Sequence, residues 1–163
     1  MTDQMTDDGR APRGEGIDDT GVVGRRVVRR GVVDSTMKEA WELVRRGAPE
    51  GTVVVAERQR AGRGRQERVW HSPEGGLYFS VLLAASPEVV RGMALTILAG
   101  LAMAETIRAA CPDVPVVLEW PNDLMVGRRK VAGILAEMRT PEGGEEPVAV
   151  LGVGVNVAVD LSE

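Results

Sequence analysis

The sequence predicts an α+β fold in which a mixed, largely antiparallel sheet packs with helices. Six or seven short apolar segments have the β-branched composition of strands, and several are joined by short turns, whereas only two segments have helical character. The chain has 163 residues, of which 44% are hydrophobic and 27% are charged. This size and this composition are those of one globular domain with a packed core.

The expected strands are rich in valine and other apolar residues. They cover residues 22–33, 52–57, 77–85, 116–120, 124–126, 131–138 and 148–157. Gly127-Arg128 is expected to form a hairpin turn between two of them, and residues 59–76 and 140–147 are expected to be polar loops. The last strand is apolar on both faces, which is typical of a strand that is covered on both sides. Because the chain ends soon after it, we expect one cover to be missing and an apolar patch to be exposed.

The first expected helix follows Asp34-Ser35-Thr36 and ends at Gly47. Thr36 and Glu39 have the spacing of a capping box. The second expected helix begins at Ser86-Pro87-Glu88, with a cap, a proline in the first turn and an acidic residue near the positive end of the helix dipole. It ends near residue 110, before a Cys-Pro pair. Because this helix is apolar on most faces, we expect it to be buried against the sheet.

Residues 1–21 are rich in Asp, Gly and Arg and are expected to form a disordered tail, so the folded domain is assigned to residues 22–163. The net charge of −4 argues against a dedicated nucleic-acid-binding protein. Cys111 is the single cysteine, which excludes an intrachain disulfide and favours a reducing compartment. We find neither a signal peptide nor an apolar stretch long enough to cross a bilayer, and we expect a cytoplasmic protein with no membrane partner.

The single histidine, His71, lies in a Pro/Gly-rich turn and is expected to have no role in proton transfer. A zinc site would need more histidine or cysteine than this chain contains, and a Ser-His-Asp or Cys-His hydrolase would need His71 as its base. The remaining chemistry depends on arginine, lysine, carboxylates, backbone amides and Mg²⁺.

Residues 59–70 combine glycines with arginines and a tryptophan. Gly62 and Gly64 let the backbone approach a ligand closely. The arginines at positions 63, 65 and 68 offer planar guanidinium groups that suit phosphate or carboxylate oxygens, and Trp70 offers a flat face. The segment favours a nucleotide site, but a solvated arginine loop, or one that touches RNA, has the same composition.

Three further segments offer functional groups. Pro121-Asn122-Asp123 forms a turn, in which Asp123 either faces Mg²⁺ and phosphate or, with Asn122, merely closes the turn. The chain has only two lysines beside eighteen arginines, and Lys130 is one of them. Either the position needs a compact point charge, or a lysine occurs there by chance. Gly152 and Gly154 alternate in a strand before Asn156, which leaves room for a flat ligand or for a tightly packed crossing strand.

The order of these motifs resembles the catalytic domain of biotin–protein ligases over roughly residues 32–157. The resemblance rests on Asp34-Ser35-Thr36, Gln59, Gly62-Arg63-Gly64-Arg65, Trp70-His71-Ser72-Pro73, Gly75-Gly76-Leu77, Trp120-Pro121-Asn122-Asp123-Leu124, Lys130-Val131-Ala132-Gly133-Ile134-Leu135, Glu137 and residues 152–156. It implies a fold related to class II aminoacyl-tRNA synthetases. It also implies a two-step reaction, in which ATP activates biotin to biotinyl-5′-AMP and biotin then passes to a lysine of a biotin carboxyl carrier protein.

The resemblance also implies roles for individual residues. Lys130 and Arg65 would act in catalysis, and Asp123 would bind Mg²⁺. The biotin-binding residues would be Ser35, Thr36, Gln59, Arg63 and Gly133. The nucleotide-binding residues would be Arg63, Arg65, Arg68, Trp70, Asn122 and Asn156.

Two positions depart from the family pattern. Members usually have a small residue in place of Glu67 and a lysine in place of Glu119. A lipoate–protein ligase of the same fold usually carries an Arg-Arg-x-Ser-Gly-Gly-Gly-Ala loop, which is not found here. A degenerate fragment that binds ligand without turnover is the other alternative. We also expect no DNA-binding domain and a catalytic domain that is truncated at its C-terminus, and homodimer formation is left open.

Overall fold

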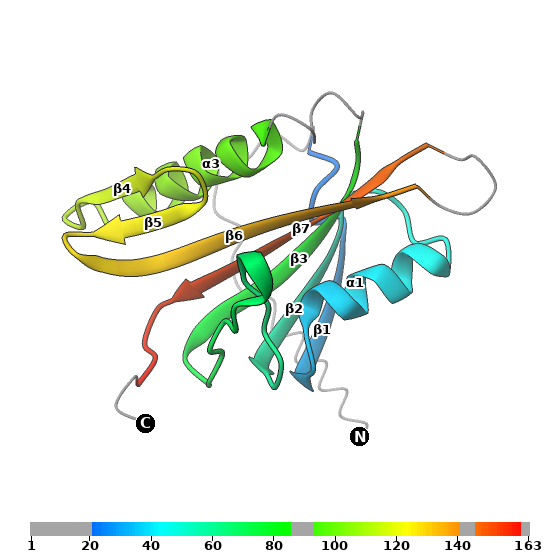
Figure 1. The fold of residues 1–163 in the computed structure, drawn as a ribbon, viewed down its shortest axis with the longest axis horizontal. Coiled ribbons are helices and arrows are strands. Elements are labelled where there is room, and N and C mark those ends of the chain that lie inside the picture. Colours follow the sequence, from blue (N-terminus) through cyan, green and yellow to red (C-terminus); the bar gives the residue numbers. More distant parts are fainter. Residues whose placement is uncertain (1–20, 86–92, 141–145, 161–163) are drawn as a thin grey trace, which may run out of the picture.

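The computed structural model describes residues 21–85, 93–140 and 146–160. In this part, seven strands form one sheet in the order β1-β2-β3-β7-β6-β5-β4, and two α-helices pack on it (Figure 1). The strands are β1 (Arg26–Val33), β2 (Thr52–Gln59), β3 (Gly76–Ala84), β4 (Val116–Glu119), β5 (Asp123–Val126), β6 (Arg129–Arg139) and β7 (Val148–Asn156). The helices are α1 (Thr36–Arg45) and α3 (Ala94–Ala110).

The sheet is mixed, as the sequence predicts. β1 and β2 are parallel, and every other neighbouring pair is antiparallel. A parallel pair needs a crossover connection, and α1 supplies it between β1 and β2. The first strand begins later than expected, at Arg26, and the predicted tail and most of the 140–147 loop lie outside the described residues.

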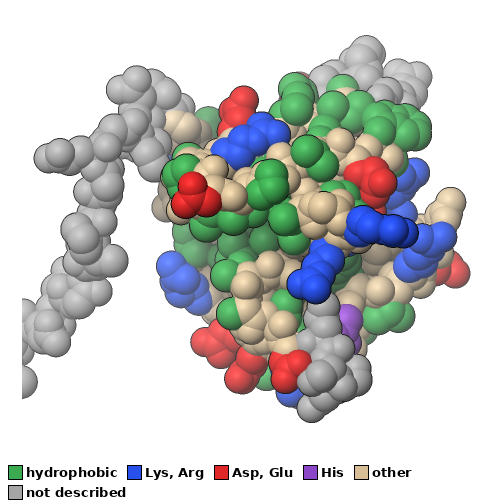
Figure 2. Space-filling model, turned by 90° about the vertical axis from the view of Figure 1, so that its left-hand side faces the viewer, with side chains coloured by type: hydrophobic (Ala, Val, Ile, Leu, Met, Phe, Trp, Pro, Cys, Tyr) green, Lys and Arg blue, Asp and Glu red, His purple; other side chains and the backbone are tan. Residues whose placement is uncertain are grey.

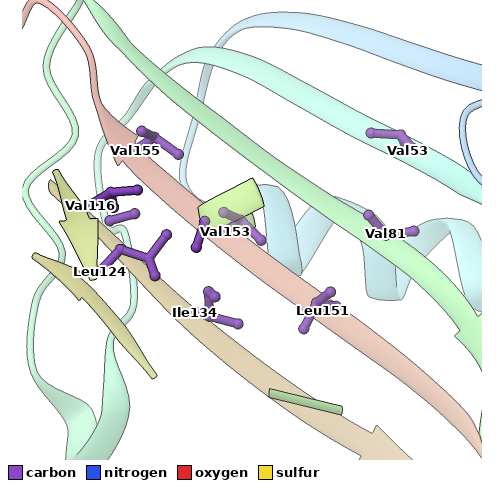
Figure 3. Close-up of a cluster of buried hydrophobic side chains, with 10 residues drawn as sticks. Val53, Val81, Val116, Leu124, Ile134, Leu151, Val153 and Val155 are labelled. Atoms are coloured by element: carbon purple, nitrogen blue, oxygen red, sulfur yellow. The ribbon is translucent and has the colours of Figure 1, made fainter. Parts of the chain in front are cut away.

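The two faces of the sheet carry separate hydrophobic clusters. Neighbouring residues of one strand, such as Val53 and Val54, belong to different clusters because successive side chains alternate between faces. α1 covers the first face, where Met37 and Trp41 pack with residues of β2, β3 and β7. Figure 3 shows the second cluster, to which β2, β3, β4, β5, β6 and β7 contribute apolar side chains. β7 is buried on both faces except at its ends, so the missing cover expected on one face is not observed.

The capping box predicted at the start of α1 is wrong. Ser35 is the N-cap, and its hydroxyl accepts a hydrogen bond from the Met37 backbone N–H at 3.3 Å. Thr36 is instead the first helical residue, and Glu39 forms an ion pair with Arg30 at 3.2 Å. The expected glycine at the other end is confirmed, because Gly47 follows the helix with φ of +72°.

The prediction that the second helix is buried holds for one face only. The predicted start at residues 86–88 lies outside the described residues, and the predicted end is confirmed at Ala110. Leu98 and Leu101 are 60% and 48% exposed. The side toward the sheet is lined by small residues, and a Cβ on Gly100 would lie 2.7 Å from a methyl group of Leu118. Figure 2, which looks onto the end that carries β4 and β5, shows apolar side chains among charged ones on the surface.

The described helices contain no segment that is long and apolar enough to cross a membrane.

Candidate functional site

A cavity of about 350 Å³ lies beside the N-terminal end of α1, between the sheet and the 60–70 loop. Its lining brings together residues of five predicted segments that are far apart in the sequence, which are 34–36, 59–70, 121–123, 130–137 and 152–156. The lining residues are Ser35, Thr36, Met37, Gln59, Arg63, Gly64, Arg65, Gln66, Arg68, Val69, Trp70, Asn122, Asp123, Lys130, Gly133, Ile134, Leu135, Gly152, Val153 and Gly154. Four cations and one carboxylate are among them, which favours an anionic ligand.

One end of the cavity is held by a chain of hydrogen bonds around Gln59. The backbone N–H and the hydroxyl of Thr36 donate to the Gln59 amide oxygen at 2.8 and 3.2 Å. The Ser80 hydroxyl donates to the Thr36 hydroxyl at 2.8 Å, and the Gln59 amide nitrogen donates to the Ser72 hydroxyl at 2.9 Å. Ser72 in turn donates to the Trp70 carbonyl at 3.0 Å. The orientation of the Gln59 amide is therefore fixed before any ligand arrives.

The other end carries a network of charged and polar side chains. Lys130 Nζ lies 2.7 Å from Asp123 Oδ2, and the Asn122 amide nitrogen donates to Asp123 Oδ1 at 2.7 Å. Arg65 donates to Asn122 Oδ1 at 2.9 Å, and the Lys130 ammonium lies 5.1 Å from the centre of a Trp70 ring. The side chains of the 121–123 turn therefore reach across to β6 and to the loop, rather than only closing their own turn.

The glycines of β6 and β7 face other side chains of this chain. Gly133 and Gly154 are paired in the β6–β7 ladder, and the Trp70 indole lies over both. A Cβ on Gly154 would overlap Trp70 Nε1, and a Cβ on Gly133 would lie 2.9 Å from the ring. Met37 lies over Gly152, and a Cβ on this glycine would be 2.8 Å from the Met37 sulfur. The Trp70 indole and the Met37 thioether therefore occupy the space above these glycines. The sequence predicted a flat ligand or a crossing strand there and did not predict these two side chains.

The 60–70 loop has an unusual backbone. Gln66 and Glu67 have φ of +53° and +61°, a region that non-glycine residues seldom adopt. Gly62 is required sterically, because a Cβ there would overlap the Trp70 carbonyl. Glu67 is exposed and lies outside the set of residues that line the cavity.

All but one of the predicted site residues line the cavity. The exception is Asn156, whose amide nitrogen donates to the Lys130 carbonyl at 3.2 Å and so supports the strand that carries Lys130. The sequence reasoning missed Ser72, Ser80 and Met37, and it assigned no role to Glu137. Ser72 and Glu137 belong to segments that carry the family resemblance, which is a signal for them. Nothing in the local sequence of Ser80 and Met37 indicates a ligand site, because their positions follow from strand pairing and helix packing.

The fit of a metal ion was tested from the side chains present. The described residues contain no group of three or more His, Cys, Asp or Glu side chains that could hold a metal ion. Asp123 is a single carboxylate at the cavity. This arrangement fits Mg²⁺ when substrate phosphates supply the other ligands, which is the usual way that proteins hold this ion.

The sequence profile described as the Biotin/lipoate A/B protein ligase family matches residues 30–156. The chain belongs to this family. Among curated members, it is 42% identical over 139 residues to "Bifunctional ligase/repressor BirA" of Bacillus spizizenii, covering 85% of this chain and 42% of that protein. It is 37% identical over 126 residues to "Biotin--[acetyl-CoA-carboxylase] ligase" of Paracoccus denitrificans, covering 77% of this chain and 52% of that protein.

Solved structures of the family have the same fold. A biotin protein ligase of Leishmania major in complex with biotinyl-5-AMP has a TM-score of 0.70 and 28% identity, with 85% of this chain and 60% of that chain covered. The ligase of Aquifex aeolicus in complex with biotin and ATP has a TM-score of 0.66 and 31% identity, with 85% and 56% covered. The resemblance to biotin–protein ligases and the predicted fold class are confirmed. The chain spans about half the length of the curated relatives described above.

Proposed function

We propose that this chain uses ATP to activate biotin as biotinyl-5′-AMP and transfers biotin to a lysine of a carrier protein. The observation that carries the proposal is the convergence of most of the family motifs on one cavity, with a hydrogen-bonding network around Gln59 and a cationic network around Lys130. The names of the relatives, and the biotin, ATP and biotinyl-5-AMP in the related structures, support the same assignment.

In the first step, a carboxylate oxygen of biotin attacks the α-phosphorus of ATP. The new oxygen–phosphorus bond forms as the bond to the β-phosphate oxygen breaks, and pyrophosphate leaves. Two anions must meet, so cations have to neutralise the charge that develops between them. Lys130 and Arg65 are proposed for this role, because both line the cavity and both are held by the Asn122–Asp123 network.

Biotin is proposed to bind at the end of the cavity beside α1. Its ureido group offers one carbonyl acceptor and two N–H donors, which match the hydroxyls of Ser35 and Thr36 and the amide of Gln59. Gly133 contributes its backbone, and Arg63 lies at the edge of the same cavity. The hydrogen bonds around Gln59 orient these groups in advance, which lowers the entropy cost of binding.

The nucleotide is proposed to bind at the cationic end. Arg63, Arg65 and Arg68 suit its phosphates. Trp70 and Asn122 are proposed to contact its base and ribose, and Asn156 is proposed to act from the end of β7 beside the cavity, which it does not line. Asp123 would hold Mg²⁺, which, when bound together with the phosphates, neutralises part of their charge.

In the second step, the uncharged amine of a carrier lysine attacks the carbonyl carbon of the mixed anhydride. An amide bond forms as the bond from the carbonyl carbon to the phosphate oxygen breaks. AMP leaves with the bonding electrons, and the proton lost by the amine nitrogen passes to the phosphate of AMP or to water. No protein nucleophile or histidine base is needed, in keeping with the exposed position of His71. The proposed partner is a biotin carboxyl carrier domain, and the proposed location is the cytoplasm.

The test is biotin-dependent exchange of labelled pyrophosphate into ATP, together with calorimetric titration of biotin and of lipoate. We expect exchange with biotin and no binding of lipoate. Exchange with lipoate alone would identify a lipoate-type ligase, and biotin binding without exchange would identify a fragment without turnover. Transfer to a biotin carboxyl carrier domain tests the second step separately.

A further inference from the structure

Glu137 on β6 is the least explained residue of the family motif. Its carboxylate lies next to the cavity without lining it, and its side chain is 19% exposed. The two oxygens have different partners. Oε2 accepts a hydrogen bond from the Trp41 indole at 3.0 Å and lies 3.3 Å from the Arg139 guanidinium, whereas Oε1 lies 2.6 Å from that of Arg63.

The partners of Oε2 belong to the scaffold. Trp41 is only 6% exposed and packs in the cluster under α1. Arg139 lies over the Trp41 ring at 4.3 Å and belongs to the same strand as Glu137. Neither residue lines the cavity. The Glu137 carboxylate is therefore bound on its Oε2 side by Trp41 and Arg139, which do not line the cavity.

The partner of Oε1 belongs to the cavity. Arg63 comes from the 60–70 loop and lines the cavity, and its side chain is 53% exposed. A guanidinium has five N–H donors in a planar fork, so the bond to Glu137 leaves others free for a ligand. Glu137 also faces Arg139, so two arginines share one carboxylate and the cluster keeps a net positive charge. Glu137 thus holds Arg63 in place without cancelling the attraction of the site for an anion.

We propose that Glu137 is a positioning residue that fixes the Arg63 guanidinium at the cavity so that it retains the phosphate of the adenylate intermediate. The inference rests on the proposed function. A free arginine side chain would lose rotamer freedom on meeting the phosphate, and Glu137 removes that freedom beforehand. Because the phosphate is joined to biotin only in the intermediate, the effect is larger on retention of the adenylate than on binding of free biotin, to which Arg63 is also proposed to contribute.

The central variant is Glu137→Gln, which keeps the size of the side chain and an oxygen that can accept from Trp41 but loses the charge that holds Arg63. Arg139→Gln is the matched control, since it removes an arginine from the same carboxylate without touching the loop. We expect biotinyl-5′-AMP to dissociate about tenfold faster from Glu137→Gln, as for the loss of one charge-assisted contact, with a smaller loss of biotin affinity. In an Arg63→Ala background, Glu137→Gln should have no further effect.

Hydrogen exchange of the amides at residues 62–70 gives a readout that needs no ligand. We expect faster exchange in Glu137→Gln than in the wild type or in Arg139→Gln. If Glu137→Gln does not fold, Arg63→Met breaks the same pair from the exposed loop, and exchange must again rise. Unchanged loop exchange, equal effects of Glu137→Gln and Arg139→Gln, or an additive effect with Arg63→Ala would overturn the proposal. A wild-type protein that neither forms nor binds the adenylate would refute the proposed function, while the exchange experiment would still report whether Glu137 holds Arg63.

Discussion

At the scale of single residues, the two lysines of this chain occupy contrasting positions. Lys38 pairs with Asp34 at 2.9 Å on the exposed surface of α1, and Lys130 pairs with Asp123 at 2.7 Å in the cavity. The hydrogen bond from Lys38 lowers the pKa of Asp34. Both pairs have similar geometry, so their difference in function depends on what else is nearby. Only the second lies among arginines and the face of a tryptophan.

Replacing Lys130 by alanine is expected to slow adenylate formation by about 10²–10³, because the ammonium group acts where charge develops. Lys130→Arg should not restore the rate fully, since a planar guanidinium occupies different space. Pyrophosphate exchange measures the rate, and circular dichroism checks the fold. Lys38→Ala is the matched control and should keep wild-type exchange. Full activity of Lys130→Ala would contradict its proposed role.

Arg65→Ala is expected to weaken retention of the adenylate more than binding of biotin. Arg65 is oriented by its bond to Asn122, and a charge-assisted contact between its guanidinium and a phosphate contributes about 1.5–3 kcal/mol. The phosphate with which it would interact is joined to biotin only in the intermediate. Dissociation of biotinyl-5′-AMP should be measured beside biotin affinity by calorimetry. Equal losses in both quantities would argue against this assignment.

Tyr78 offers a direct test of burial, because it is the single tyrosine of the chain. It is fully buried, its hydroxyl donates to the Pro73 carbonyl at 2.9 Å, and burial raises its pKa above the ordinary value of about 10. The folded state therefore holds this proton more tightly than the unfolded state. Its contribution to stability should be complete below pH 10 and lost as the pH rises further. Absorbance titration of the native protein should give a midpoint above the one in denaturant, and identical midpoints would refute burial.

At the scale of elements, the site is an arrangement of a loop against two strands. The β6–β7 register places Gly133 opposite Gly154, and the 60–70 loop lays Trp70 across both. Glycine is needed there because of close approach, not because of its backbone angles. The loop is held at its base by the bridge between Gln59 and Ser72 and within itself by the bridge between Arg63 and Val69.

Gly154→Ala is expected to destabilise the fold by about 1–3 kcal/mol, because the new methyl group overlaps the Trp70 indole. Gly31→Ala is the matched control on β1, where a Cβ meets only an ordinary contact at 3.8 Å. Urea unfolding measures both. In a Trp70→Ala background the cost of Gly154→Ala should disappear. A Gly154→Ala protein as stable as Gly31→Ala would show that the indole does not occupy this position.

At the scale of the whole molecule, the sheet separates two hydrophobic clusters that share β2, β3, β6 and β7. A residue such as Leu82 faces α1, while Leu124 belongs to the cluster on the other face. Because every shared strand contributes side chains to both faces, loss of either cluster should remove support from the other. The described domain is therefore expected to unfold as one cooperative unit.

Leu82→Ala and Leu124→Ala test whether the two hydrophobic clusters unfold together. Both side chains are at most 1% exposed, and each truncation should cost about 2–5 kcal/mol. Both should shift the same single unfolding transition, followed by circular dichroism and by tryptophan fluorescence. Two separate transitions, each sensitive to one substitution only, would mean that the faces unfold independently.

Much of the fold and of the site was predictable from local sequence. Valine-rich segments, turn residues and the glycine after α1 identify the elements, because these signals depend on periodicity and backbone preference within a few residues. The motif order identified the family, and all the predicted site residues except Asn156 line one cavity. Thr36 lines this cavity, although its predicted capping role was wrong.

Tertiary structure alone decided which of these residues meet. Spacing permits a capping box at Thr36, but pairing with Gln59, 23 residues away, takes its hydroxyl into another network. Strand register and the path of the loop bring Glu137 into contact with Arg63. They also place the Trp70 indole over Gly133 and Gly154. Local sequence specifies which face a side chain occupies, whereas register and packing specify the neighbour it finds there, because those are set by the sum of contacts across the whole sheet.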